Sequence, residues 1–225
     1  MQNNSSSAER IREKKKLFLA REQRIIAAAI ELFLEDGIDR VTVSKIAVRA
    51  GIGKGTVYKH FLTKNEILIR IILDYERNIT ESLTEGIARA EAGDSGAAAK
   101  SYFESRLENP RLDRLMQQLE DRLVESAEAT AQIQELYELR RSNEDALSGL
   151  MTQLIDRGVL EDVPPHFHYL ACWALAQGAV ELCFNKTWDF KDTDKLMEFI
   201  TNIGVTMGNR GQIRDSNLQP PKTDK

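Results

Sequence analysis

Apolar positions along the chain recur at helical spacing in several separate blocks. The first block covers residues 21–35, and Gly37 marks its end. Its apolar stripe consists of Ile25, Ala29, Leu32 and Phe33. Strand-like alternation of apolar and polar residues is not sustained anywhere over a useful length. The pattern therefore predicts an all-α protein.

Two short blocks joined by a glycine turn follow the first. Thr42 is placed to cap a helix over residues 43–50, whose apolar positions share one face. The next segment, GKGTVYKHF at residues 53–61, is polar apart from Val57 and Phe61. A short helix, a glycine turn and a second short helix form the arrangement of a helix–turn–helix. We therefore predict that residues 53–61 are its second helix.

The outward face of this second helix has the chemistry of a DNA-reading surface. At about 100° per residue, Val57 and Phe61 face the core while Gly55 and Lys59 point away. Glycine allows close approach of the backbone, and lysine reaches phosphates or base edges. A short amphipathic helix is common in any helical domain. This face alone therefore does not exclude an ordinary structural helix without a DNA-binding role.

The rest of the chain continues the helical pattern. Thr63 and Glu66 form a capping box, and a long helix runs from there to about Ala92. Beyond it, glycine and proline breaks separate further helices. These helices carry Tyr102, Phe103 and Leu107, then residues 112–123, and then residues 127–157, 165–186 and 193–208.

Charge is distributed unevenly along the 225 residues. Residues 1–65 hold 13 Lys and Arg against 7 Asp and Glu, while the remainder holds 18 against 28. The basic residues 1–65 followed by an acidic remainder favour a polyanionic partner for the N-terminal part. A solvated basic tail explains the excess of positive charge equally well. Cys172 and Cys183 are the only cysteines and are typical of buried thiols in a reducing compartment. No apolar run is long enough to span a membrane.

Residues 21–65 resemble the DNA-binding domain of the TetR family of bacterial transcriptional regulators. The matching stretches are IIAAAIELFLEDG, TVSKIAVRAG and GKGTVYKHF, with Lys64 just after them. The resemblance implies DNA contacts from ten residues, at phosphates or in the major groove. They are Thr42, Ser44, Lys45, Lys54, Gly55, Thr56, Tyr58, Lys59, His60 and Lys64. For His60 and Tyr58 a purely structural role remains the alternative.

The resemblance also divides the chain into regions. Residues 1–20 are a basic extension, which either continues the first helix or forms a flexible arm. Residues 21–65 are the helix–turn–helix domain, residues 66–209 a helical regulatory and dimerisation domain, and residues 210–225 a disordered tail. The expected protein is a homodimer that binds a pseudo-palindromic operator in double-stranded DNA.

The segment HYLACWALAQGAVELCF is the best candidate for the dimer interface. It is apolar almost all round, and Ala171, Ala174 and Gly178 permit close contact between helices. The alternative is that this helix is simply the centre of the core.

A pocket for a small effector is implied by the family rather than by any spacing. Its candidate lining residues are Tyr102, Phe103, Met116, Leu119, Leu123, Trp173 and Gln177. Each of them also suits a plain core position. Together they favour a mainly apolar effector, whose binding would shift the dimer away from the form that fits the operator.

An enzyme is not indicated. His60, His166 and His168 lack metal-ligand spacing, and the sequence has no serine elbow, phosphate-binding glycine loop or triad signature. No cofactor, metal or membrane partner is expected, and a cytoplasmic repressor is the favoured interpretation. An α-helical adaptor that binds protein without specific DNA recognition is the alternative. The sequence does not distinguish a repressor from an activator.

Overall fold

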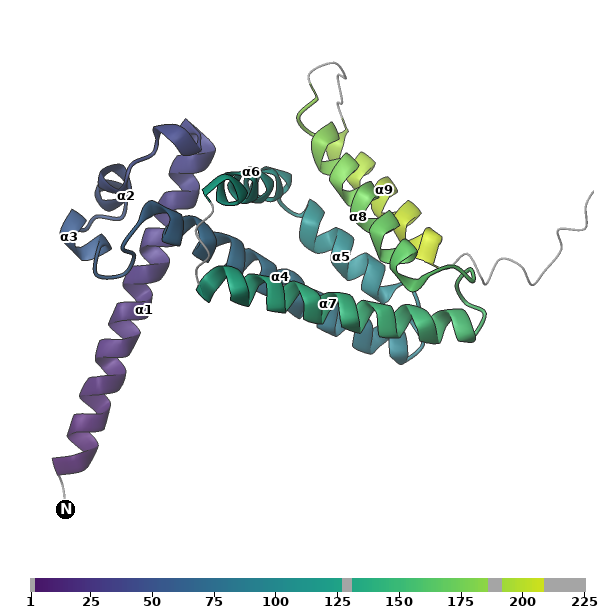
Figure 1. Ribbon diagram of the computed structural model, residues 1–225, viewed down its shortest axis with the longest axis horizontal. Helices are drawn as coiled ribbons and strands as arrows, with labels where there is room; N and C mark the ends of the chain where they lie inside the picture. Colours follow the sequence, from purple (N-terminus) through teal and green to yellow (C-terminus); the bar gives the residue numbers. More distant parts are fainter. Residues whose placement is uncertain (1–2, 127–130, 186–191, 209–225) are drawn as a thin grey trace, which may run out of the picture. The chain divides into compact units, whose positions relative to one another are not determined.

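The computed structural model describes residues 3–126, 131–185 and 192–208, and every regular element in these ranges is a helix (Figure 1). The prediction of an all-α protein is confirmed. The elements are α1 (Asn3–Asp36), η1 (Ile38–Arg40), α2 (Val43–Arg49), α3 (Lys54–Val57), α4 (Lys64–Glu91), α5 (Ala97–Leu107), α6 (Pro110–Ser126), α7 (Ala131–Asp156), α8 (Pro165–Leu182) and α9 (Thr193–Gly208). Across these described ranges, no helix has the length and apolar character that a membrane span needs. The predicted tail, residues 210–225, lies outside them.

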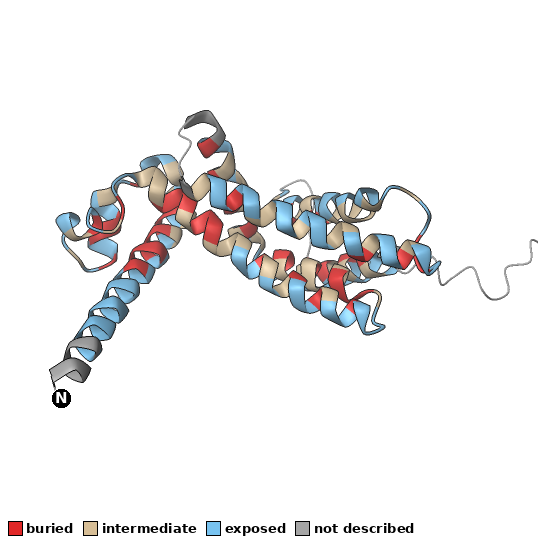
Figure 2. Ribbon diagram, turned by 60° about the horizontal axis from the view of Figure 1, so that its bottom comes forward, coloured by how far each residue is buried: buried red, intermediate tan, exposed pale blue. Residues whose placement is uncertain are grey.

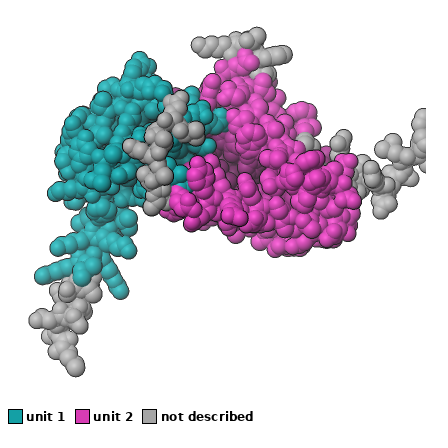
Figure 3. Space-filling view, viewed as in Figure 1, with its two compact units in different colours: residues 1–74, 115–133 teal, residues 75–114, 134–225 magenta. Residues whose placement is uncertain are grey.

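The chain divides into two compact units (Figure 3). The first unit comprises residues 1–74 and 115–133, and the second comprises residues 75–114 and 134–225. The boundaries therefore fall inside three helices, α4, α6 and α7. The first turns of α4 belong with the helix–turn–helix because they contribute Ile67 and Ile71 to the buried apolar residues of that unit.

The core of the first unit forms where the C-terminal part of α1 packs against α2 and α2 packs against α3. Ile25, Ile46 and Val57, one from each of these helices, have no exposed surface. The turn between α2 and α3 depends on Gly51, whose φ of +64° lies in the left-handed region that side chains disfavour. Arg24 of α1 donates a 2.5 Å hydrogen bond to the carbonyl of Ala50, which satisfies an acceptor at the end of α2.

The second unit contains two apolar clusters. One joins the end of α4, the start of α5 and the end of α7 through Ala90, Ala97, Leu150 and neighbouring residues. The other joins α5, α8 and α9 around Phe103. Phe103 is fully buried against Gly204, where an added Cβ would lie 2.0 Å from the ring. The chain therefore needs a glycine at this point of α9 to let the ring pack.

Candidate nucleic-acid interface and ligand region

The helix–turn–helix is defined by a cap and a very short second helix. Thr42 has extended backbone, and its hydroxyl accepts a 3.3 Å hydrogen bond from the backbone N–H of Lys45, which caps α2 as predicted. Helix α3 is shorter than predicted and covers four residues, Lys54–Val57. After Val57 the backbone tightens, because the N–H groups of Lys59 and His60 bond to carbonyls only three residues back.

The predicted division of residues 53–61 into a buried and an outward side is confirmed by burial. Val57 and Phe61 are buried, whereas Lys54, Gly55 and Lys59 are exposed. Thr56 is half-buried beside them. The exposed phenol of Tyr58 lies under the ammonium group of Lys54, which is 5.8 Å from the ring centroid. This side presents two cations, a phenol and an open backbone, with nothing within 4 Å of the Cβ position of Gly55.

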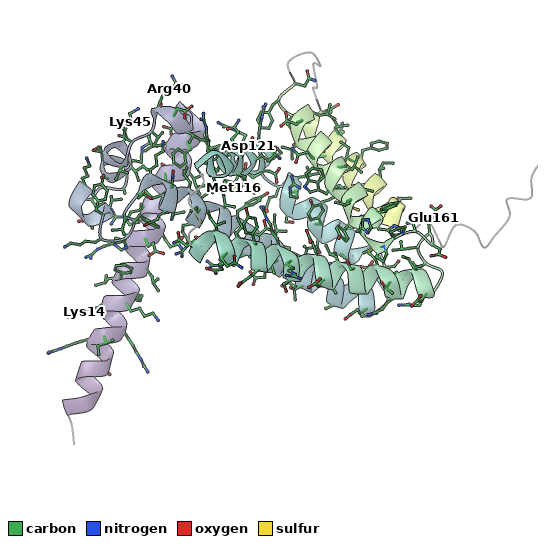
Figure 4. All side chains as sticks on the ribbon, viewed as in Figure 1. Lys14, Arg40, Lys45, Met116, Asp121 and Glu161 are labelled. Carbon is green, nitrogen blue, oxygen red and sulfur yellow. The ribbon has the colours of Figure 1, made fainter. Side chains whose placement is uncertain are left out.

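Three further candidates lie at the start of α2. Thr42, Ser44 and Lys45 are all exposed, and Figure 4 labels Lys45. The Thr42 hydroxyl, which accepts one hydrogen bond, can still donate its own hydrogen to a second partner. Lys45 forms a 2.9 Å ion pair with Asp36 at the end of α1. The pair is exposed, so its lysine can exchange that partner for a phosphate at little cost.

Lys64 is engaged inside the first unit. Its ammonium group donates a 2.5 Å hydrogen bond to the carbonyl of Ile38 and lies 5.7 Å from the ring centroid of Phe33. Burial lowers the pKa of Lys64. The structure thus gives Lys64 a structural role, tying α4 to η1, rather than an open position facing solvent.

His60 is also enclosed. Its side chain is 2% exposed and stacks on Phe18 of α1, with the ring centroids 4.0 Å apart. Its Nδ1 atom is buried without a hydrogen-bond partner, 3.8 Å from the carboxylate of Glu22, which itself pairs with Arg70 at 2.5 Å. This is the buried position that the sequence left open as the alternative to a phosphate contact.

The candidate effector residues fall into different environments. Met116, Leu119 and Leu123 are buried in the first unit, while Phe103 is buried in the second. Trp173 is 52% exposed on the outer side of α8. Four of these five residues are thus buried within their own units, and the fifth is exposed.

Tyr102 and Gln177 belong instead to a buried polar network in the second unit. Arg106 forms a bidentate pair with Asp113 and also donates to the Tyr102 hydroxyl at 2.7 Å and to the Gln177 side-chain oxygen at 3.2 Å. Tyr75 donates to the same carboxylate of Asp113. Burial raises the pKa of Tyr102 to about 12, so its hydroxyl stays neutral. One guanidinium thus fixes residues from α5, α6 and α8.

A groove of about 690 Å³ lies in the second unit, between residues of α4, α5 and α9 and the start of α6. None of the seven candidate effector residues lines it. Its wall includes four glutamates, Glu85, Glu104, Glu108 and Glu198. The described residues contain no group of three His, Cys, Asp or Glu side chains that could hold a metal ion.

Helices α8 and α9 leave an apolar face uncovered. Ala176, Ala179 and Val180 are buried against the rest of the second unit, but Phe167, Leu170 and Trp173 are exposed on α8. Phe199 and Ile203 are exposed on α9. Among the predicted dimer residues, Ala174 and Gly178 are exposed and Ala171 is half-buried. Helix α8 is therefore not a central core helix, the alternative that the sequence left open.

Sequence reasoning missed two groups of residues. It did not connect Phe18 and Glu22 with His60, or Arg106 with Asp113. A signal for the second pair was present, because Arg106 and Asp113 are charged residues in otherwise apolar positions on either side of the Asn109–Pro110 helix break. The contact between Phe18 and His60 joins residues 42 apart, and no local pattern marks it.

The chain is similar to known regulators in sequence. A family model for bacterial regulatory proteins of the tetR family matches residues 25–71. The fatty acid metabolism regulator protein of Bacillus subtilis is 30% identical over 141 residues, which cover 62% of this chain and 70% of that protein. The regulator SrpR of Pseudomonas putida is 37% identical over 70 residues, which cover 30% of this chain and only 33% of SrpR.

Solved structures share the fold over most of the chain. A tetR-family regulatory protein from Rhodococcus RHA1 superposes with a TM-score of 0.65 at 19% identity, covering 84% of this chain and 97% of the other. The regulator FadR from Bacillus subtilis, solved in complex with stearoyl-CoA, superposes with a TM-score of 0.62 at 24% identity, covering 82% and 98%. Both similarities extend beyond the helix–turn–helix into the helices that follow it.

Proposed function

The chain belongs to the TetR family of DNA-binding transcriptional regulators, and we propose that it is a repressor that binds a pseudo-palindromic operator as a homodimer and leaves it when an effector binds. The observation that carries this proposal is the outward side of residues 54–61, which comprise α3 and the turn after it. Lys54, Gly55 and Lys59 are exposed there, while Val57 and Phe61 anchor the segment from behind. Because the proposed operator is chromosomal DNA, we also propose that the protein acts in the cytoplasm.

The proposed DNA contacts fall into two groups: those that read base edges and those that position the protein on the phosphate backbone. Lys54, Gly55, Thr56 and Lys59 would enter the major groove, where lysine and the open backbone reach base edges. Thr42, Ser44 and Lys45 would bind phosphates at the N-terminus of α2 and set the register. Tyr58 would add a phosphate contact from its exposed hydroxyl. His60 and Lys64 would support this surface from within, because both already have partners or cover inside the first unit.

The uncovered apolar face of α8 and α9 supports the homodimer. Both helices carry exposed aromatic residues, and α8 also carries the small residues Ala171, Ala174 and Gly178. Such a face suits contact with the same face of a second copy. A two-fold axis through this face would repeat α3 on both sides of the operator centre. Ala174→Glu should therefore give monomers in sedimentation and lose operator binding. A variant that stays dimeric would show that this face is not the dimer interface.

The effector we propose is a long-chain acyl compound. The supporting observations are the 30% identity to a fatty acid metabolism regulator and the shared fold with FadR, whose structure holds stearoyl-CoA. The acidic groove of the second unit does not suit an acyl-CoA, so the apolar part would have to enter between helices that are packed here. Titration with stearoyl-CoA should release the protein from bound DNA, whereas titration with free CoA, the control, should not.

The first experiment is selection of genomic DNA fragments by the purified protein at about 150 mM salt, because nonspecific binding is strongly salt-dependent. We expect enrichment of one palindromic site. Lys59→Gln should then weaken binding to that site, while Arg141→Gln, which removes an exposed cation of α7, should not. Retention of random fragments, or of none, would instead favour a protein-binding adaptor.

A further inference from the structure

Lys54 is flanked by two glycines at the start of α3. It is the first residue of this helix, and Gly53 and Gly55 on either side have no side chain that could restrict it. All three residues are exposed and belong to the pale blue positions of the helix–turn–helix in Figure 2. A lysine in such surroundings keeps most of its rotamer freedom, which is large for this residue type. A group outside the two glycines is therefore needed to fix its direction.

The ring of Tyr58 is in a position to do this. The ammonium group of Lys54 lies 5.8 Å from the centroid of the ring, within the range of a cation–π contact. The backbone N–H of Tyr58 bonds to the carbonyl of Lys54 at 3.2 Å, so one helical turn brings both side chains to the same side. Within the described part of the chain, no hydrogen bond or ion pair holds the Lys54 ammonium group. The Tyr58 ring is thus what limits its orientation.

Lys59, the second exposed cation of this segment, is not held in the same way. It follows Tyr58 directly, and consecutive residues do not face each other on a helix. The residues that the structure describes include no aromatic ring against its ammonium group. Tyr58 therefore distinguishes between two lysines that have the same charge and are both exposed.

We propose that Tyr58 is a positioning residue for base readout, whose ring holds the Lys54 side chain in the direction of a base edge in the major groove. This inference rests on the proposed function and on the groove contact of Lys54 given there. A lysine that turns freely also meets nearby phosphates, which carry no sequence information, whereas guanine offers it two acceptors in the major groove. A side chain that is restricted before binding loses less freedom when it makes the specific contact.

The two ends of Tyr58 then have different functions. Its hydroxyl, bound to a phosphate, adds affinity for every sequence, whereas its ring adds preference for one base through Lys54. Tyr58→Phe removes the hydroxyl and keeps the ring, and Tyr58→Leu removes both. Tyr58 is 43% exposed, so neither substitution leaves a cavity in the core, and circular dichroism should show an unchanged fold for both.

The test is a double-mutant cycle measured on base preference. Affinities of the full-length variants are determined for the selected operator and for copies of it in which each base pair is changed in turn. Lys54→Gln identifies the base pair that Lys54 reads, because it should remove the preference there. Tyr58→Leu should lower the preference at the same base pair by about two- to fivefold, the factor that corresponds to a cation–π contact at an exposed site.

The other variants separate the ring from the hydroxyl and from general effects. Tyr58→Phe should leave the base preference unchanged and weaken binding to every copy alike. In the Lys54→Gln background, Tyr58→Leu should have no further effect on the preference. The control cycle combines Tyr58→Leu with Lys59→Gln, whose effects on base preference should be additive because the two side chains make no contact.

A second measurement needs no DNA. In the NMR spectrum of the free protein, the ring current of residue 58 should shift the Cε proton resonances of Lys54, with Tyr58→Phe retaining the shift and Tyr58→Leu losing it. The proposal would be overturned by the absence of this shift, by a Lys54→Gln protein with unchanged preference at every base pair, by equal loss of preference in Tyr58→Phe and Tyr58→Leu, or by additive effects of Tyr58→Leu and Lys54→Gln. The proposed function would fail separately, if the wild-type protein showed the shift but selected no operator.

Discussion

The two compact units use charge and apolar surface in opposite ways. The first unit has a mainly apolar core, in which Glu22 is the buried carboxylate, and it directs Lys54, Lys59 and the cations of α1 outward. The second unit buries an arginine and an aspartate, Arg106 and Asp113, inside its core and leaves aromatic residues of α8 and α9 exposed. The outward charge of the first unit suits a polyanion, whereas the outward apolar face of the second suits another copy of the chain.

The difference also concerns how helices are fixed. In the first unit, the short helices are set largely by a cap and a glycine turn, which are local features, together with the bond from Arg24 to the carbonyl of Ala50. In the second, helices from distant parts of the sequence are fixed by one hydrogen-bonded guanidinium. A buried ion pair of this kind adds little net stability over an apolar core, but it is costly to break because the remaining charge has no partner. The second unit should therefore be the more sensitive one to single polar substitutions.

Asp113→Ala should have the largest effect. It leaves the guanidinium of Arg106, which is 6% exposed, without its carboxylate and removes the acceptor of Tyr75. We expect the free energy of unfolding to fall by about 3–5 kcal/mol, measured by urea denaturation followed by circular dichroism.

The matched control for that change is Asp121→Ala, an exposed aspartate on the same helix, α6. It should change the free energy of unfolding by less than about 0.5 kcal/mol. Equal effects of the two substitutions would contradict the view that the network around Arg106 fixes the second unit.

Gly204→Ala tests packing in the second unit without a change in charge. The added methyl group would lie 2.0 Å from the ring of Phe103, which has no exposed surface, so the ring or α9 must shift. We expect a loss of about 1–3 kcal/mol in the free energy of unfolding. Gly149→Ala on α7 has nothing within 4 Å of its Cβ and should instead stabilise by about 0.5–1 kcal/mol. A stabilising Gly204→Ala would show that α9 does not pack on Phe103 in this way.

The first unit was predictable because its signals are local. Thr42 and the glycine turn lie within a few residues of the helices they set, and the apolar stripe at Ile25 and Phe33 has helical spacing. The prediction placed Val57 and Phe61 in the core, and both are buried. The length of α3 was overestimated, because the tightening after Val57 depends on three-residue hydrogen bonds that side-chain periodicity does not reveal.

The second unit was less predictable because its key contacts join distant residues. Arg106 meets Gln177 from 71 residues away, and the choice of which face of α8 is buried depends on α5 and α9 rather than on α8 itself. Helix α8 is apolar almost all round, so its periodicity does not show which side is covered. Trp173 therefore looked suitable for a pocket but lies on the uncovered face.

Thr42→Ala should have a smaller effect than either core substitution, and it belongs to the first unit. It removes the acceptor for the backbone N–H of Lys45 and so costs about 1 kcal/mol of stability. Operator affinity should fall as well if the hydroxyl also binds a phosphate. Thr42→Ser keeps the hydroxyl and should restore both quantities. A Thr42→Ala protein with unchanged stability would show that this cap does not hold α2.

The smallest expected effect is chemical and concerns Cys172 of α8. Burial raises the pKa of this thiol to about 11, because the charged thiolate is disfavoured away from water. At pH 8 only about 0.1% of it would then be thiolate, against roughly a quarter of an ordinary cysteine with a pKa of about 8.5. In a Cys183→Ser background, alkylation by iodoacetamide should be slow and should rise about tenfold per pH unit from pH 7 to 10, because only the thiolate reacts. Mass spectrometry of the native protein gives the rate, and the same protein in urea gives the ordinary thiol. A rate that levels off near pH 9 would mean that the Cys172 side of α8 is open to solvent, and the contrast between a packed inner side and an uncovered outer side of this helix would have to be abandoned.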